Sequence, residues 1–487
     1  MTEVDPIMSN LDMPSWKSSP LVRQLLLFAV YLFPISTATV PLVAFDTGWH
    51  LNSGRWIVEQ GHVPWTDPFT TVGDDSVWIA YSWLFSVALY GIHSLAGLAG
   101  IWLARVVMAC VLVAALHGFV DRRMPNFAAR MFVVGLAGYA LTRPMLSERP
   151  VLFSILFTIA TLEAVCRIRE RRPLGIFAAL PVVYALWANI HIQWIHGLFL
   201  IGLSAASMIA ERIWRKEGEA FGRTVLLFAG CAIATLVNPY GWRLYDVILS
   251  YGSNAEIYEL FGELHSMEFR LSYDWAVLAI FGLACAALGR GNHSLFDLVA
   301  LAACAYFSFH AKHELWLVVL AAAMVLARLP MGTDRESNVT GREFACTLGG
   351  YAALLAISMS IWPPAARIEA FHREEFPMMA IEFIERENLR GPICAATEWG
   401  AYVAWKLPDR RVTIDGRAAL HGGPRTRRIH ELMQGRPGWE RDADLRSAQT
   451  ILVSRYAPLA ELLRLHPDFR LRHEDDRFVV FTPRVKD

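Results

Sequence analysis

Residues 25–45 read LLLFAVYLFPISTATVPLVAF, and residues 46–56 continue directly as DTGWHLNSGRW. The first stretch is apolar and long enough to cross a bilayer, because a transmembrane helix needs about 20 such residues. The second places Asp46 where the chain leaves the lipid. His50, four residues on, would share its helix face, and Arg55 is close enough to bind an anion, so both are candidate substrate-binding groups. A carboxylate at this point predicts either a helix-end anchor among the lipid headgroups or a general base for an acceptor hydroxyl.

The same alternation of apolar runs and polar loops continues along the chain. Of the 487 residues, 55% are hydrophobic and 18% are charged, whereas soluble proteins carry about 25% charged residues. Apolar runs recur as far as residue 362 and then stop. We therefore predict a polytopic α-helical membrane protein with about eleven spans, or about twelve if residues 77–96 also cross. The formal net charge of +0 does not indicate a nucleic-acid partner.

Lysine and arginine predict the orientation, because short cytoplasmic loops are enriched in them. The basic stretches that alternate along the chain are 121–126, 167–172, 212–223, Arg290 and 327–343. We place these in the cytoplasm together with the N-terminal segment 1–22. The transmembrane domain is then 23–363, and its first outer loop is 46–97. Within that loop, the Trp, Tyr and His content of residues 77–96 predicts a helix along the membrane surface.

Residues 364–487 are predicted to form an extracytoplasmic α/β domain. The predicted helices are 378–388 and 458–465, and the predicted strands are 392–397, 410–414, 449–454 and 478–483. Neither a G-x-G-x-x-G stretch nor a P-loop is present, so the sequence indicates no nucleotide site. Acceptor binding, a lid over the membrane site and partner docking all remain open as roles for this domain.

The predicted outer loop RPMLSERP (143–150) contains Arg143, Glu148 and Arg149. Two guanidinium groups in so short a loop could bind a phosphate, and Glu148 could be a second carboxylate close to Asp46. Interfacial anchoring with a local ion pair is the alternative.

Two further outer loops carry polar groups beside aromatic ones. In WANIHIQWIHG (187–197), Asn189 and His191 suit the hydroxyls of a sugar, although both could simply cap the loop. In FHAKHEL (309–315), Lys312 and His313 lie together. A lysine on the outer side opposes the positive-inside trend, so a lipid phosphate or an acidic partner is expected there.

The layout of these features resembles the GT-C glycosyltransferases, among them protein O-mannosyltransferases and lipid A aminoarabinose transferases. The shared features are a first span that ends in Asp, a long first outer loop, an arginine early in the second span (Arg105) and polar outer loops. Three stretches are specifically similar to a bacterial branch of that superfamily: DTGWHLNSGRWIVEQGHVPWTDPFTT (46–71), WANIHIQWIHG (187–197) and EWGAYVAWKLPDRRVTIDGR (398–417).

The resemblance implies an inverting transferase in the bacterial inner membrane. Its donor would be a sugar on a polyprenyl phosphate, and its acceptor an envelope glycan, lipid or protein on the outer face. It makes Asp46 the catalytic base, Glu148 the second acidic group, and Lys312 and His313 ligands of the lipid phosphate. Some members of the superfamily use a divalent metal and others do not, so the resemblance leaves a metal site open.

Two other functions are compatible with the same sequence. A transporter or flippase of lipid-linked saccharides would show internal repeats and polar groups near the bilayer midplane. No repeat is evident, and the polar groups gather at the outer ends of the apolar runs. An inactive GT-C-like scaffold would depend mainly on the C-terminal domain, so that removing this domain would abolish its function.

Overall fold

The computed structural model describes residues 23–24, 26–32, 45–73, 76–145, 147–215, 219–253, 255–290, 293–331 and 375–484. Most of the apolar run 25–45 and all of the run 344–362 lie outside these ranges, as does segment 1–22. The number of spans and the domain boundaries therefore stay predictions.

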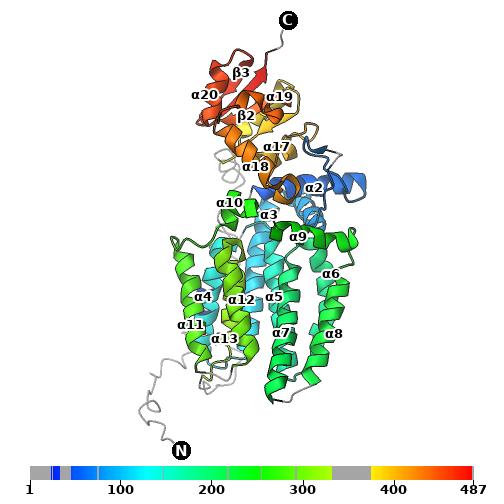
Figure 1. Ribbon diagram of the computed structural model, residues 1–487. Coiled ribbons are helices and arrows are strands. Elements are labelled where there is room, and N and C mark those ends of the chain that lie inside the picture. The colour runs from blue at the N-terminus through cyan, green and yellow to red at the C-terminus, as the bar shows by residue number, and fades with distance from the viewer. Residues whose placement is uncertain are drawn as a thin grey trace, which may run out of the picture.

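A bundle of apolar helices makes up most of the described chain (Figure 1). Its members are α3 (Trp83–Asp121), α4 (Phe127–Met145), α5 (Val151–Arg169), α6 (Leu180–Ile190), α7 (Trp194–Arg215), α8 (Glu219–Ala234), α11 (Ser272–Leu288), α12 (Leu295–His310) and α13 (Leu315–Leu326). By length and composition, 3 of the described helices could cross a membrane, namely α3, α5 and the 194–211 part of α7, and shorter apolar helices accompany them. The chain is a membrane protein, as predicted.

Helix α13 is surrounded by other helices of the bundle. Its sequence LWLVVLAAAMVL is apolar on every face, and each of its residues is buried. A helix without a polar face is stable only when other helices surround it, and α13 packs on α4, α11 and α12. The turn that leads into it, η7 (Lys312–Glu314), is therefore held in place.

Two helices, rather than one, form the region after the first apolar run. Helix α2 (Asp46–Gln60) begins at Asp46 and lies across the end of the bundle (Figure 1). The helix predicted over 77–96 begins only at Trp83 and continues into α3, with a break at Gly97. Gly97 has φ 60° and ψ −156°, a conformation open essentially to glycine alone. The break separates the predicted surface helix from the predicted span.

The segment between α8 and α11 is also more helical than expected. It contains η5 (Gly241–Arg243), α9 (Leu244–Ser253), α10 (Ala255–Leu260) and η6 (Gly262–Leu264). These elements cover the same end of the bundle as α2 (Figure 1). The sequence had predicted only a connecting loop here, because none of these short helices has a long apolar period.

The C-terminal part is an α/β unit beyond α2 (Figure 1). Its elements are η8 (Trp439–Arg441), the helices α16 (Met378–Arg386), α17 (Thr397–Lys406), α18 (Ala418–Met433), α19 (Ala443–Ser447) and α20 (Pro458–Leu465), and the strands β1 (Ile393–Ala395), β2 (Thr450–Ser454), β3 (Phe469–Glu474) and β4 (Phe478–Pro483). The sheet order is β1-β2-β4-β3, with β1 parallel to β2 and the other pairs antiparallel.

Three of the four predicted strands are confirmed, and the strand predicted at 410–414 is wrong. Val412 makes only isolated bridges, to Thr70 and to Ile393. Its N–H donates to the Phe69 carbonyl, and its carbonyl accepts from the Thr71 N–H. The stretch thus ties the C-terminal unit to the first outer loop. Strand β3 escaped prediction because its sequence FRLRHE alternates charged groups along a partly exposed edge.

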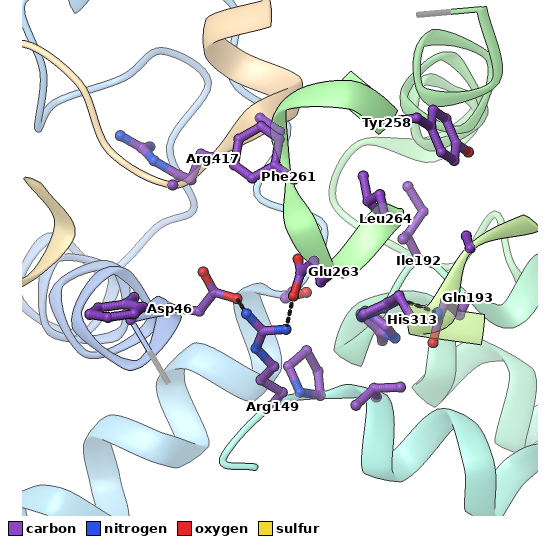
Figure 2. A pocket seen from close by; sticks show the side chains of 18 of the residues that line it. Asp46, Arg149, Ile192, Gln193, Tyr258, Phe261, Glu263, Leu264, His313 and Arg417 are labelled. Atoms are coloured by element: carbon purple, nitrogen blue, oxygen red, sulfur yellow. Dashed lines mark hydrogen bonds and ion pairs between the residues drawn. The ribbon is translucent and has the colours of Figure 1, made fainter. Parts of the chain in front are cut away.

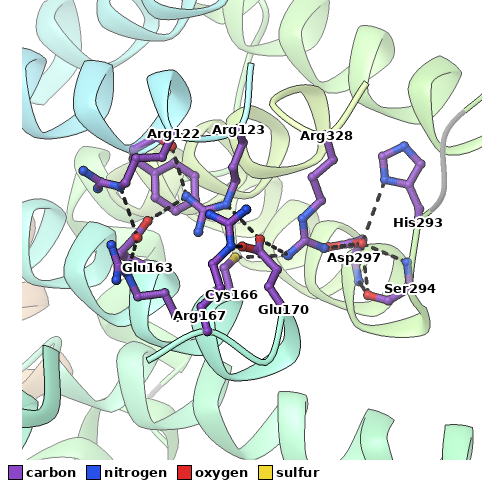
Figure 3. Close-up of polar contacts among 12 residues, drawn as sticks. Arg122, Arg123, Glu163, Cys166, Arg167, Glu170, His293, Ser294, Asp297 and Arg328 are labelled. Carbon is purple, nitrogen blue, oxygen red and sulfur yellow. Dashed lines mark hydrogen bonds and ion pairs between the residues drawn. The ribbon is translucent and has the colours of Figure 1, made fainter. Parts of the chain in front are cut away.

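Arginines that follow or end α3, α5 and α13 take part in a set of polar contacts (Figure 3). Glu163 is ion-paired with three arginines, at N–O distances of 3.1 Å to Arg122, 2.6 Å to Arg123 and 2.6 Å to Arg167. Arg328 pairs with Asp297 at 2.5 Å. Three of the predicted basic stretches, 121–126, 167–172 and 327–343, thus contribute arginines to these contacts, and the side of the membrane to which they belong stays a prediction.

Candidate functional site

A cavity of about 840 Å³ lies where α2, the α8–α11 segment, η7 and the C-terminal unit meet (Figure 2). Each of the three stretches that carry the family resemblance contributes to its wall. The contributing side chains include Asp46, His50, His191, Gln193, His196, Glu398 and Arg417. Segments far apart in the sequence thus build one site.

Asp46 is the first residue of α2 and points toward Arg149 (Figure 2). Its Oδ2 lies 2.6 Å from an Arg149 nitrogen. Burial raises the pKa of Asp46 above its ordinary value, and the Arg149 guanidinium opposes this shift. A carboxylate with a raised pKa is a stronger base than a solvated one while it remains ionised near neutral pH.

Arg149 also forms an ion pair with Glu263 of η6, so its guanidinium bridges two carboxylates (Figure 2). Glu148, which the sequence proposed as the second carboxylate, does not line the cavity. It is buried against Arg105 at 3.2 Å and accepts a hydrogen bond from Thr47. Glu263 lines the cavity and shares Arg149 with Asp46. Sequence reasoning missed this residue because it belongs to no motif.

Two buried histidines supply neutral hydrogen-bonding groups to the cavity. His50 Nδ1 lies 2.9 Å from Ser86 Oγ, and His191 Nδ1 lies 2.8 Å from Ser154 Oγ. Burial lowers the pKa of His50 well below its usual range and that of His191 to about 3. Near neutral pH both rings are uncharged, which suits sugar hydroxyls better than a phosphate.

A third histidine of the cavity, His313, has the reverse tendency. Burial lowers the pKa of His313, but Glu314 and Glu263 outweigh this effect and raise it above the ordinary value. The pKa of Glu314 falls to about 2, because His196, His313 and a 2.8 Å hydrogen bond from Gln193 outweigh its burial. His313 therefore tends to carry a positive charge beside Arg149.

Lys312 does not line the large cavity but a neighbouring pocket of about 110 Å³. That pocket is lined by Ser147, Arg149, Val151, Glu263, Tyr273, Lys312, His313 and Leu315. Arg149, Glu263 and His313 line both spaces. Basic groups thus concentrate along the boundary between the two.

Two other candidates, Arg55 and Asn189, do not line the cavity. Arg55 donates to Asn52 at 2.5 Å along α2. Asn189 accepts from the Trp83 indole at 2.7 Å and donates to the Val237 carbonyl at 2.8 Å, so it joins helix ends. The side chain of Arg143 lies outside the described part of the chain.

The residues at the centre of the cavity do not fit a divalent metal. Two of the cavity's carboxylates, Asp46 and Glu263, are bridged by the Arg149 guanidinium. Within the described ranges, no group of three or more His, Cys, Asp or Glu side chains could hold a metal ion. The positive charge at this point comes from arginine.

A buried ion cluster holds the C-terminal unit against the first outer loop. Arg417 donates to Asp67 at 2.8 Å and pairs with Asp415 at 2.7 Å, and His421 lies 3.0 Å from Asp415. The arginine and its two carboxylates are almost fully buried. Asp67 also accepts hydrogen bonds from the backbone N–H groups of Phe69 and Thr70.

The same cluster brings the C-terminal unit close to Asp46. A Cβ placed on Gly416 would lie 3.4 Å from Asp46 Oδ1. Gly48, one turn into α2, faces the backbone of Ala401 and Tyr402 in α17 so closely that a Cβ there would lie 2.8 Å from the Tyr402 nitrogen. Glycine at both positions lets the two backbones approach. The C-terminal unit therefore forms a wall of the cavity.

The chain was compared with known proteins by sequence and by structure. No protein-family model and no curated protein matches the sequence. Among solved structures, ArnT from Cupriavidus metallidurans bound to undecaprenyl phosphate is similar, with 15% identity and a TM-score of 0.52 over 95% of this chain and 97% of that one. The oligosaccharyltransferase AglB from Archaeoglobus fulgidus, in complex with an inhibitory peptide and a dolichol-phosphate, matches with 12% identity and a TM-score of 0.49 over 90% of this chain and 69% of that one. The chain has the fold of the GT-C glycosyltransferases, as its sequence predicted.

Proposed function

We propose that this protein transfers a sugar from a polyprenyl-phosphate donor to a hydroxyl of an envelope acceptor, with inversion at the anomeric carbon. The observation that carries the proposal is the position of Asp46: a partly buried carboxylate of raised pKa, in a cavity of about 840 Å³, beside a guanidinium. The similar fold of ArnT, which is bound to undecaprenyl phosphate, supports the class of donor.

In the proposed reaction, Asp46 accepts the proton of the acceptor hydroxyl as its oxygen attacks the anomeric carbon. The bond between that carbon and the phosphate oxygen breaks, and the phosphate leaves with the bonding electrons. A single displacement inverts the anomeric centre. Arg149 stabilises the negative charge that develops on the phosphate, because guanidinium pairs well with phosphate oxygens.

The groups around Asp46 divide the cavity into two regions. Arg149, His313 and the nearby Lys312 suit the donor phosphate, which reaches the site from the membrane. The uncharged rings of His50 and His191 suit the hydroxyls of the sugar. The wall formed by the C-terminal unit faces the space left for the acceptor. We place this end of the protein on the outer face of a bacterial inner membrane.

The proposal is tested by mass spectrometry of envelope glycans, lipids and glycoproteins from a deletion strain and its parent. The deletion is expected to remove one sugar from one class of molecule. A plasmid with the wild-type gene should restore the sugar, whereas one with Asp46→Asn should not. An envelope identical in all four strains contradicts the proposal.

A further inference from the structure

Glu263 lies among several cationic groups. Its carboxylate is ion-paired with Arg149 and lies within the electrostatic reach of His313 and Lys312. The three cationic groups come from two elements, the turn before α5 and η7. Converging basic groups of this kind favour a phosphate, because guanidinium pairs well with its several acceptor oxygens.

The position of Glu263 is on the boundary between two spaces. It lines both the large cavity and the pocket of about 110 Å³ next to it. Tyr273 and Leu315, at the ends of α11 and α13, line only the smaller pocket, so this pocket lies toward the helix bundle. A phosphate on a membrane-embedded chain would reach Arg149 from that side.

Of the two carboxylates on Arg149, Glu263 is the less firmly held. Asp46 starts a 15-residue helix that packs against α3 and α17. Glu263 lies in η6, a helix of 3 residues. Its side chain is 41% exposed, against 25% for Asp46. An incoming anion can therefore replace Glu263 at the guanidinium without disturbing α2.

We propose that Glu263 is an internal competitor for the donor phosphate: it occupies the phosphate position of the unloaded site, and the lipid phosphate displaces it from Arg149. The class of ligand rests on the proposed function. After displacement, Arg149 contacts both the leaving phosphate and the Asp46 carboxylate. Donor binding thereby places the leaving phosphate and the base Asp46 in contact with the same guanidinium. In the empty site, Glu263 instead balances the charge of Arg149.

The test is the binding of undecaprenyl phosphate to the full-length protein in detergent, measured by microscale thermophoresis. Glu263→Gln keeps the shape of the side chain and removes its charge, so the dissociation constant should fall roughly three- to tenfold. Glu268→Gln is the matched control, because Glu268 is in the same segment, is exposed and pairs with Arg270 instead. It should bind like the wild type. Thermal unfolding of each variant verifies the fold.

Equal or weaker binding by Glu263→Gln, with normal binding by the wild type, would overturn the competitor role and leave the proposed function intact. Lack of binding by the wild type and both variants would overturn the proposed donor as well. Inorganic phosphate is expected to bind at least about tenfold more weakly, because it has no chain to contact the apolar helices. Equal affinity for inorganic phosphate would overturn a lipid source.

Discussion

Replacing Arg417 by Met should release the C-terminal unit from the first outer loop. The side chain of Arg417 is 4% exposed, and its partners Asp67 and Asp415 are 0% and 1% exposed. Removing one partner of a buried ion pair typically costs about 3–5 kcal/mol, because the remaining charge stays buried without its partner. His421 still faces Asp415, and backbone N–H groups still reach Asp67. We therefore expect a cost at the lower end of this range, about 3 kcal/mol in the free energy of opening the interface.

Hydrogen exchange is the assay that isolates this effect. The amides of Thr71 and Val412 bond across the interface, to the carbonyls of Val412 and Phe69. A loss of about 3 kcal/mol in the free energy of opening corresponds to roughly a hundredfold faster exchange at these two amides. Amides between β2 and β4, inside the C-terminal unit, should exchange at unchanged rates.

Arg427→Met is the matched control for this experiment. Arg427 joins the same unit to α10 through Glu256 and Glu259, but these pairs are exposed. Exposed ion pairs contribute little to stability, because water screens them. The reasoning is refuted if exchange at Thr71 and Val412 accelerates no more in Arg417→Met than in Arg427→Met.

Two other predictions concern the walls of the cavity. Gly48→Ala should lower both the thermal unfolding temperature and transfer activity, because its Cβ would lie 2.8 Å from the Tyr402 nitrogen. Gly91→Ala is the control and should change neither, because a Cβ there meets nothing within 4 Å. Equal effects of the two substitutions would contradict the close contact at Gly48. The affinity for undecaprenyl phosphate should fall as pH rises through the pKa of His313, which neighbouring carboxylates raise above 6.5, since the cation is present below that pKa and lost above it. Titration of the dissociation constant in wild type and His313→Asn tests this, and the same pH dependence in both would refute it.

The sequence was sufficient for the parts of the site that depend on local position. Asp46 follows an apolar run and lies four residues before His50, a spacing that predicts one helix face, and both residues line the same cavity. The alternation of basic loops likewise predicted which ends of the helices lie together. Each of these inferences uses only a short stretch of chain, together with the helical period, the apolar length of a membrane span or the distribution of basic residues in loops.

Contacts between distant segments could not be predicted in this way. Glu148 and Arg149 are adjacent in the sequence, yet Arg149 points into the cavity and Glu148 into the bundle toward Arg105. Glu263 reaches Arg149 across 114 residues, and Arg417 reaches Asp67 across 350. The partner of a charged side chain depends on how the connecting helices pack in the folded protein. The local pattern of apolar and polar residues does not predict that packing.

The most direct test of the proposed chemistry is transfer by purified Asp46→Asn. Asparagine keeps the size of the side chain but cannot accept the proton, and a general base contributes about 10²- to 10⁴-fold to the rate. With the donor and acceptor identified from the envelope comparison, we expect turnover to fall by roughly that factor, while undecaprenyl phosphate still binds and the protein still inserts. Turnover equal to that of the wild type would contradict the role of Asp46 as the base.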